Sequence, residues 1–157
     1  MAEDNDPGRV WDMIEKIRFC MLATNDGKDI RSRPMTAHAE RGENAVYFLL
    51  DLKDHKNPDA FANTCMAFAD TGDMDYASVS GAGEVYDDRA RIEELWSAAY
   101  KAFWDGPDDP DIRVLKVTPK DAQYWDGAGK LVTFAKMLTA AVSDSKPELG
   151  DHGKVRM

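Results

Sequence analysis

The spacing of apolar residues predicts three helices, and the cap Asn57-Pro58 predicts a further short helix through about Ala62. Apolar side chains recur at helical spacing over residues 10–17, directly after an Asp6-Pro7 pair that is typical of a helix start. A second helix is predicted behind Asp88 as its N-cap, and a last short one over residues 131–142. Together with Trp11 and Trp96, the residues assigned to core or dimer packing are those on the apolar face of the second helix, Ile92, Leu95, Ala99 and Phe103.

Short apolar runs bounded by turn sequences predict the strands. Pro34 places the second of them at an edge or a bulge, because proline cannot donate to a strand ladder. Gly81 and Gly83 are expected to bend another strand or to let backbone approach it closely. Five or six strands are predicted, over 19–24, 29–39, 45–50, 65–69, 76–86 and 112–117, and residues 122–125 form a further short aromatic stretch.

The connections between these strands indicate the fold class. Most of them are too short for the crossover that a parallel pair needs. The sequence therefore predicts a mainly β fold, an antiparallel barrel with helices packed outside it, and argues against a doubly wound parallel sheet. The 157 residues correspond to a single domain. We expect its core within about residues 9–142 and a polar C-terminal tail over residues 143–157.

The net charge of −9 narrows the choice of partners. The overall field of the protein repels nucleic acid and anionic membranes, so we expect neither as a partner. No apolar run approaches the length of a membrane span, and the acidic N-terminus lacks the apolar core of a signal peptide. The two cysteines have no metal-binding spacing and make no disulfide framework. These features predict a cytoplasmic protein.

Most catalytic signatures are missing from the sequence. The chain has no nucleophile elbow, no P-loop, no complete dinucleotide fingerprint and no zinc-protease motif. Its three histidines are far apart, and the acidic clusters at 70–75 and 105–111 lack the pattern of a calcium loop. We therefore expect solvated acidic loops, predict no metal site, and can name no catalytic acid or base.

Two groups of cations stand out against this acidic background. Arg31 and Arg33 lie two residues apart on one predicted strand, so their side chains project from the same face. Lys53, His55 and Lys56 follow the next strand, which a hairpin would bring alongside. Together they could hold a phosphate monoester, with the arginines forking onto its oxygens. An exposed strand edge and a solvated loop explain the pattern equally well.

In their order along the chain, several segments resemble the pyridoxamine 5′-phosphate oxidase-like flavin-binding split barrels, in particular the general stress protein branch. The resemblance spans roughly residues 9–126. It implies a six-stranded antiparallel Greek-key split barrel that forms a homodimer, with FMN in the two grooves between the subunits. The segments that carry it are 32–36, 46–56, 79–85, 88–89, 94–96, 103–110 and 117–126, with 150–152 in the tail.

The resemblance also implies roles for individual residues. Residues 31–35 would line the flavin ring and the ribityl chain, partly through backbone groups. The pair His55 and Lys56 resembles the family's phosphate-binding pair, and two further positions, Ser80 and Trp125, would approach the flavin of the partner subunit. The implied cofactor-binding residues are Arg31, Ser32, Arg33, Pro34, Met35, Leu50, Lys53, His55, Lys56, Ser80, Trp104 and Trp125.

Two departures from the family pattern bear on function. Many relatives end the third strand with a threonine that touches the flavin, whereas this chain has Leu50 there. One lost hydrogen bond lowers affinity by up to about tenfold, so the leucine weakens FMN binding without excluding it. True pyridoxamine phosphate oxidases also carry an Arg- and His-bearing substrate segment, which residues 126–131 lack. We therefore do not expect vitamin B6 oxidation.

Four functions remain open at this point. The first is an FMN-binding general stress protein that acts as a flavin-dependent oxidoreductase, with NAD(P)H or another small molecule as electron donor. The second is a non-catalytic binder that sequesters or senses FMN. The third is a split-barrel dimer that has lost its cofactor, and Leu50 is the only observation that favours it. Deazaflavin in place of FMN is the fourth, and it is disfavoured because that site usually needs a longer basic segment.

Overall fold

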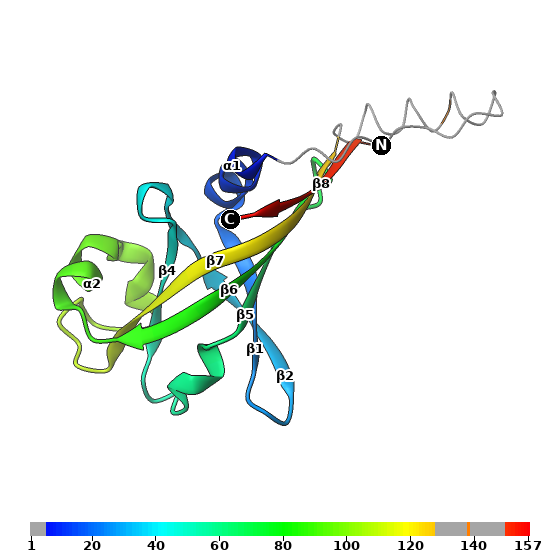
Figure 1. Cartoon of the computed structure of the whole chain (residues 1–157). Helices are drawn as coiled ribbons and strands as arrows, with labels where there is room; N and C mark the ends of the chain where they lie inside the picture. The colour runs from blue at the N-terminus through cyan, green and yellow to red at the C-terminus, as the bar shows by residue number, and fades with distance from the viewer. Residues whose placement is uncertain (1–5, 128–137, 139–149) are drawn as a thin grey trace.

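An eight-stranded antiparallel sheet forms the framework of the described part of the chain (Figure 1). The computed structural model describes residues 6–127, 138 and 150–157. The strands are β1 (Phe19–Asn25), β2 (Ile30–Thr36), β3 (His38–Glu40), β4 (Ala45–Asp51), β5 (Thr64–Asp70), β6 (Asp75–Tyr86), β7 (Ile112–Gly127) and β8 (Gly150–Arg156).

Within residues 6–127, two α-helices and three short 3₁₀ turns accompany the sheet. The first helix begins and ends where the sequence predicts, because the Asp6 carboxylate accepts a hydrogen bond from the Gly8 amide at 2.9 Å and Pro7 opens the first turn. Trp11 on this helix is buried in the core, as expected. The helical elements are α1 (Pro7–Ile17), η1 (Arg41–Glu43), η2 (Pro58–Phe61), α2 (Arg89–Leu95) and η3 (Ala98–Ala102).

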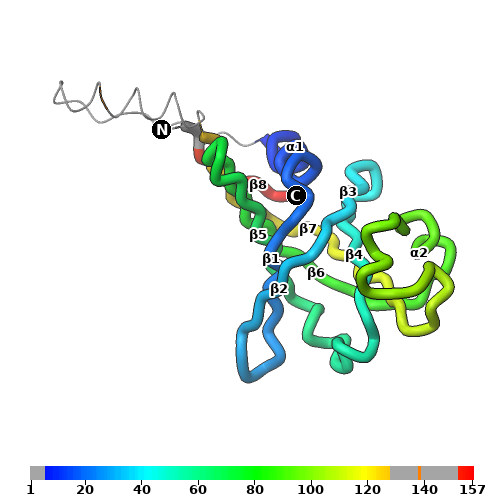
Figure 2. Tube along the Cα trace, turned by 180° about the vertical axis from the view of Figure 1, so that it is seen from behind, coloured from blue at the N-terminus to red at the C-terminus, as the bar shows by residue number. Residues whose placement is uncertain are grey.

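A single chain segment connects the two edges of the sheet. The strand order is β2-β1-β5-β6-β7-β4-β3, with β8 paired to β7. The two end strands follow one another in the chain and are separated by Ala37 alone, so the chain passes from one edge to the other (Figure 2). With β2 and β3 taken together, β1 to β7 form the predicted six-stranded antiparallel barrel, and β8 extends it. Pro34 lies in β2, at the edge of this order, as predicted.

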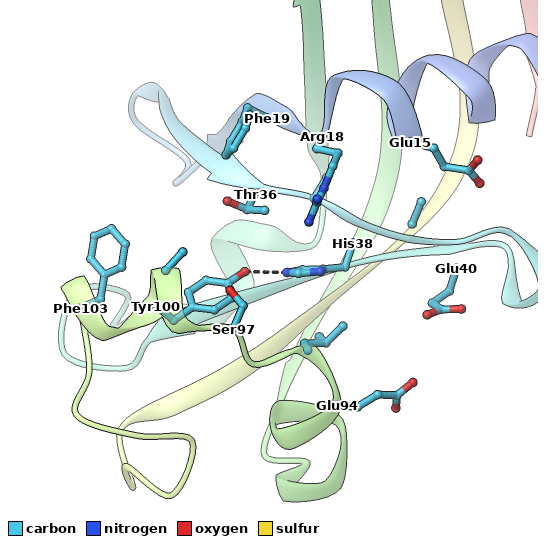
Figure 3. A pocket seen from close by; sticks show the side chains of 14 residues that line it. Glu15, Arg18, Phe19, Thr36, His38, Glu40, Glu94, Ser97, Tyr100 and Phe103 are labelled. Carbon is cyan, nitrogen blue, oxygen red and sulfur yellow. Dashed lines mark hydrogen bonds between the residues drawn. The ribbon is translucent and has the colours of Figure 1, made fainter.

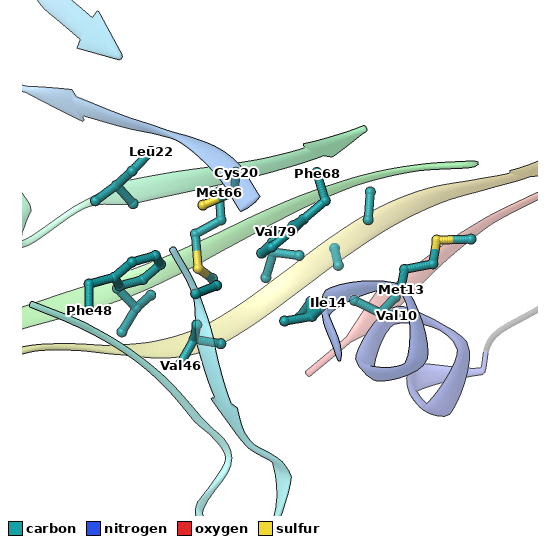
Figure 4. Packing of buried hydrophobic residues seen from close by; sticks show 14 of the residues in the cluster. Val10, Met13, Ile14, Cys20, Leu22, Val46, Phe48, Met66, Phe68 and Val79 are labelled. Carbon is teal, nitrogen blue, oxygen red and sulfur yellow. The ribbon is translucent and has the colours of Figure 1, made fainter. Parts of the chain in front are cut away.

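Two apolar clusters hold these elements together. The larger one fills the barrel, where Val10, Met13 and Ile14 of α1 pack with strand residues such as Phe48 and Phe68 (Figure 4). The smaller one lies on the other face of β4, against α2 and η3. β4 is buried on both faces because its alternate residues belong to the two clusters. The loop that follows β4 therefore starts from a firmly held position.

Both glycines of β6 serve the close approach predicted for them. The register between β6 and β7 shifts at Gly81, where a Cβ atom would lie 2.8 Å from the Thr118 carbonyl oxygen. At Gly83 a Cβ atom would collide with the carbonyl oxygen of Phe61, the last residue of η2. The missing side chain at Gly83 thus lets η2 lie directly against β6.

The second predicted helix is shorter than its apolar stripe suggests. α2 ends at Leu95, because Trp96 and Ser97 adopt extended backbone conformations before the 3₁₀ turn η3. Ile92 and Leu95 pack in the smaller cluster, but Phe103 is 74% exposed. The prediction of one helix through residue 103 is therefore wrong, and the last aromatic residue of the stripe faces a pocket instead of the core.

The C-terminal half differs from the prediction in two further places. Residues 112–127 form one strand, longer than the strand expected over 112–117, because the polar stretch 118–121 stays paired with β6. Residues 150–156, predicted as part of a polar tail, form β8, and Val155 reaches the core. The helix predicted over 131–142 lies outside the described residues except for Leu138, which is helical.

One acidic loop is organised by a lysine. Lys16 at the end of α1 lies within 4 Å of three carboxylates, with Nζ–O distances of 3.7 Å to Asp70, 2.7 Å to Asp73 and 3.2 Å to Asp75. These contacts tie α1 to the turn between β5 and β6.

In the described part of the chain, no helix has the length and apolar character needed to cross a membrane.

Candidate functional site

Residues from both groups of cations meet in one pocket. The turn between β1 and β2 and the loop after β4 lie at the same end of the barrel (Figures 1 and 2). Between them lies a hollow of about 210 Å³, which we call the cationic pocket. Its lining includes Arg31, Arg33, His55 and Lys56, together with Thr24, Asp26, Asp29, Asp54, Asn57, Ala60 and Phe61.

Arg33 is the most constrained cation of this pocket. Its Nη2 atom donates to the hydroxyl of Thr24 at 3.2 Å, and its guanidinium lies over the Phe61 ring, 5.5 Å from the centroid. Its Nη1 atom is buried and has no hydrogen-bond partner among the described residues. Burial, together with the charge of Arg31, lowers the pKa of Arg33. A buried, unpartnered guanidinium N–H favours an anionic ligand.

The loop after β4 brings a second donor to the same place. The backbone carbonyl of Asp51 accepts the His55 amide at 3.2 Å, and its carboxylate accepts the Lys53 amide at 2.8 Å, so the loop folds back on the end of β4. His55 then meets the Phe61 ring edge-on, with 5.5 Å between the ring centroids. Burial, then the charge of Arg33, lowers the pKa of His55. The imidazole therefore gains a proton readily only when an anion offsets both effects.

An apolar groove continues from the cationic pocket. This central groove has a volume of about 410 Å³ and shares Arg33, Asp54 and His55 with the pocket. The Trp104 indole is anchored in it by a 3.1 Å hydrogen bond from Nε1 to the Asp51 carboxylate. Its remaining lining comprises Phe19, Pro34, Met35, Thr36, Leu49, Leu50, Asp51, Tyr100 and Phe103.

Leu50 has two neighbourhoods. Its side chain is 2% exposed and belongs to the larger core cluster, and it also forms part of the wall of the central groove. A polar residue here would have to satisfy its hydroxyl at the border of the core. The groove wall is therefore apolar at the position where many relatives are expected to have a threonine.

Four of the predicted site residues line neither the cationic pocket nor the central groove, namely Ser32, Lys53, Ser80 and Trp125. Ser32 falls between the two arginines on β2 and lines neither the pocket nor the groove, because successive side chains of a strand point to opposite faces. Lys53 forms an ion pair with Asp111 at 2.8 Å, which raises the pKa of the lysine. Ser80 is half-buried at the bulge of β6.

Trp125 lies far from the cationic pocket. It stands near the end of β7, and the end of β7 and the beginning of β8 project away from the turn between β1 and β2 (Figure 1). Its ring is 41% exposed and stacks on His152 of β8, with 5.0 Å between centroids and 11° between planes. The chain itself therefore does not bring Trp125 or Ser80 to the groove.

Sequence patterns missed several residues of the site. Thr24 reads as an ordinary strand residue, but its buried hydroxyl fixes Arg33. Phe61 reads as a core residue, but its ring supports both Arg33 and His55. Asp51 is the one of these residues that the sequence could have indicated. An acidic residue directly after a fully apolar strand suggests a carboxylate that shapes the following loop.

The combined shape fits one kind of ligand. The cationic pocket offers a guanidinium, an imidazole and an ammonium group, which suits a phosphate monoester. The adjoining groove is lined mainly by apolar and aromatic side chains, which suits a planar ring system. A ligand with a phosphate at one end and a planar ring at the other would satisfy the unpartnered Arg33 and cover the exposed aromatic side chains.

Comparisons with known proteins point to one family. A family model described as pyridoxamine 5′-phosphate oxidase like matches residues 5–148. General stress protein 26 of Bacillus subtilis is 26% identical over 139 residues, which cover 83% of this chain and 95% of that protein.

Solved structures show the same fold. A structure from Jannaschia sp. CCS1, whose name refers to general stress protein 26, is 27% identical and superposes with a TM-score of 0.77, covering 94% of this chain and 95% of its own. The general stress FMN/FAD binding protein of Xanthomonas citri is also 27% identical, with a TM-score of 0.64 and coverage of 75% of this chain and 86% of its own. The split-barrel fold expected from the sequence is thereby confirmed.

Proposed function

The chain belongs to the pyridoxamine 5′-phosphate oxidase-like family, and from this premise we propose that it is a general stress protein that binds FMN along the cationic pocket and the central groove. The phosphate of FMN would be held by Arg33, His55 and Lys56, with Arg31 at the rim. The ring system would lie against Met35, Leu50 and the other groove residues named above.

One observation carries this proposal. Among the described residues, the buried Nη1 atom of Arg33 has no hydrogen-bond partner, although its Nη2 atom and its π face are both engaged. Native structures rarely leave such a donor unsatisfied, and a phosphate oxygen would satisfy it with a charge-assisted hydrogen bond. The acidic protein thus keeps an unsatisfied cation at the site that we propose for the phosphate of FMN.

As an enzyme, the protein would be a flavin-dependent oxidoreductase. FMN supplies the redox chemistry when bound, and the chain's residues bind it, orient it and exclude water. Trp104, held by Asp51, and the half-buried Met35 would set the apolar walls. NAD(P)H or another small molecule is the proposed electron donor. Since the substrate segment of true pyridoxamine phosphate oxidases is missing after Trp125, vitamin B6 is not the proposed substrate.

We further propose a homodimer, in which the partner completes each groove. Large apolar side chains at the groove are open in the single chain, with Phe19 68% and Phe103 74% exposed. Trp125 is also exposed, on an arm that projects from the barrel. Covering these residues would bury apolar surface and could bring Ser80 and Trp125 of one subunit towards the FMN of the other.

An absorption spectrum of the purified protein, followed by titration of the flavin-free form with FMN, tests the proposal. We expect flavin bands or quenching of flavin fluorescence at about one equivalent per chain. Fast reduction of the bound flavin by NAD(P)H with an acceptor present would support an oxidoreductase, whereas binding without reduction by any donor tested would favour sequestration or sensing. A colourless protein that does not bind added FMN would contradict the proposal and favour a dimer that has lost its cofactor.

A further inference from the structure

A third pocket opens beside the central groove (Figure 3). It has a volume of about 740 Å³ and we call it the Tyr100 pocket. It has no lining residue in common with the cationic pocket. The residues common to the groove and the Tyr100 pocket are Phe19, Thr36, Tyr100 and Phe103.

A short hydrogen bond forms the polar wall of this pocket. The His38 Nε2 atom and the Tyr100 hydroxyl lie 2.6 Å apart, and Figure 3 shows the two side chains directed toward each other. Burial, with the charge of Arg18 adding to it, lowers the pKa of His38. Burial also raises the pKa of Tyr100. Both groups are therefore neutral near pH 7, and the wall carries no charge of its own.

Arg18 is the cation of this pocket. It makes no ion pair within the described residues, and its charge acts on both His38 and Tyr100. Figure 3 shows its guanidinium extending toward His38. An unpaired guanidinium beside a neutral tyrosine–histidine pair is well placed to donate hydrogen bonds to a carboxylate.

The backbone at Arg18 is strained. It has φ 65° and ψ −38° at the C-terminal cap of α1, a region that residues with a Cβ rarely adopt. Its amide donates to the Ile14 carbonyl at 2.9 Å, and its carbonyl accepts from the Ala37 amide at 2.7 Å. Glycine is the usual residue at such a cap. A strained arginine in place of glycine points to a function for the side chain.

The other charges of the pocket leave room for an anion. Three glutamates lie at the end opposite Phe19 and Phe103 (Figure 3). Glu15 is paired with Arg41 at 3.3 Å, and Glu94 with Arg91 at 3.5 Å. Glu40 has no ion pair in the described part of the chain, and it lies two residues beyond His38 on β3. It would therefore weaken, but not cancel, the attraction of Arg18 for an anion.

We propose that the Tyr100 pocket binds a small aromatic carboxylate, with the carboxylate on Arg18 and the ring at the aromatic end formed by Phe19, Tyr100 and Phe103. Planar rings pack favourably on aromatic side chains, and this end adjoins the groove. The role of this pocket as the substrate site of a flavin oxidoreductase rests on the proposed function, because the ring lies next to the flavin only if FMN occupies the groove. The binding of a carboxylate in this pocket does not depend on the proposed function.

Calorimetric titration of the full chain with benzoate, before and after addition of FMN, tests the inference. We expect benzoate to bind at least tenfold more tightly than benzamide, which has the same ring without the charge. Arg18→Gly should weaken benzoate binding at least tenfold without lowering the melting temperature, since glycine fits the backbone there. Glu40→Gln should strengthen it. As a matched control, Asn44→Gly changes another residue with positive φ (50°) and should leave benzoate binding unchanged.

Equal binding of benzoate and benzamide, no benzoate binding at all, or wild-type binding by the Arg18→Gly variant would each overturn the inference. Titration of the same variants with FMN separates the two proposals. If FMN does not bind but benzoate binds through Arg18, the carboxylate pocket stands and the flavin function fails. If FMN binds with unchanged affinity and benzoate does not bind, the flavin function stands and this inference fails.

Discussion

The guanidinium of Arg33 lies over the ring of Phe61, 5.5 Å from its centroid, and His55 meets the same ring edge-on. Phe61 ends η2, and η2 can lie against β6 only because Gly83 has no side chain. The position of both phosphate-binding candidates thus depends on a glycine in another strand.

This dependence predicts that Gly83→Ala damages stability and the site together. Its Cβ would collide with the Phe61 carbonyl and lie 3.1 Å from Leu115, so we expect the free energy of unfolding to fall by about 1–3 kcal/mol. Affinity for FMN should fall in the same variant because η2 is displaced. Denaturant unfolding and FMN titration measure the two effects. Gly42→Ala is the control, since a Cβ there meets nothing within 4 Å, and a similar loss in that variant would refute the argument.

Two lysines of one loop should differ in their effect on FMN. Lys56 lines the cationic pocket, whereas Lys53 is paired with Asp111. Hydrogen bonds to charged groups contribute enough that we expect Arg33→Ala and Lys56→Ala each to weaken FMN binding about tenfold to a hundredfold. Lys53→Ala should stay within about twofold. Flavin fluorescence titration measures all three, and unchanged affinity in both of the first two variants would remove the phosphate assignment.

Leu50→Thr tests the apolar wall of the groove. Because Leu50 is 2% exposed and packs in the core, we expect the free energy of unfolding to fall by about 2–4 kcal/mol. A hydroxyl at the groove can donate to a bound flavin, so FMN affinity should rise by up to about tenfold. Leu22→Thr changes a fully buried core leucine that lines neither the pocket nor the groove, and it should lose stability without gaining affinity. Loss of FMN affinity in Leu50→Thr would show that this wall needs its leucine.

Sequence patterns predicted the fold well because its signals are local. The cap at Asp6, the edge proline at position 34 and the close approach at Gly83 each depend on a few neighbouring residues, and each is observed. The break at Trp96 could not be predicted, since an apolar stripe at helical spacing continued beyond it. The strand at 150–156 could not be predicted either. Its sequence is polar, and it is held to β7 by backbone pairing, which leaves no apolar pattern in the sequence.

The sequence predicted the charged residues of the candidate site, but it did not predict the residues that hold these charged side chains in place. Arg31, Arg33, His55 and Lys56 were grouped from the sequence and share one pocket. Lys53 carries the same charge but is neutralised by Asp111, a contact that only the tertiary structure shows. An aromatic support such as Phe61 carries no sequence signal that separates it from a core residue.

The strand β8 should contribute to stability as part of the barrel. Val155 is 4% exposed and belongs to the core cluster, whereas its neighbour Lys154 is exposed on the opposite face. We expect Val155→Ala to lower the free energy of unfolding by about 1–3 kcal/mol, and Lys154→Ala to change it by less than about 0.5 kcal/mol. Chemical denaturation of the two variants decides the matter, and equal stability in both would mean that β8 adds nothing to the core.

The pH dependence of FMN binding should identify His55. Burial and the charge of Arg33 lower the pKa of His55 below its ordinary 6.5, while Asp54 and Asp51 oppose the shift. In the free protein, stability from the neutral imidazole is therefore present above pH 6.5 and is lost as the pH falls toward the lowered value. His38, whose pKa is lowered too, contributes in the same direction.

A bound phosphate reverses the sign for His55, because its negative charge raises the pKa of the imidazole and binding then takes up a proton. Affinity for FMN should accordingly rise as the pH falls from about 8 to about 6.5, and the gain should end where the phosphate itself is protonated, near pH 6. Calorimetry in two buffers of different ionisation enthalpy measures the proton uptake directly. His55→Gln should abolish the uptake and flatten the profile while His38→Gln leaves both intact, and a pH-independent affinity in the wild-type protein would exclude His55 from the phosphate site.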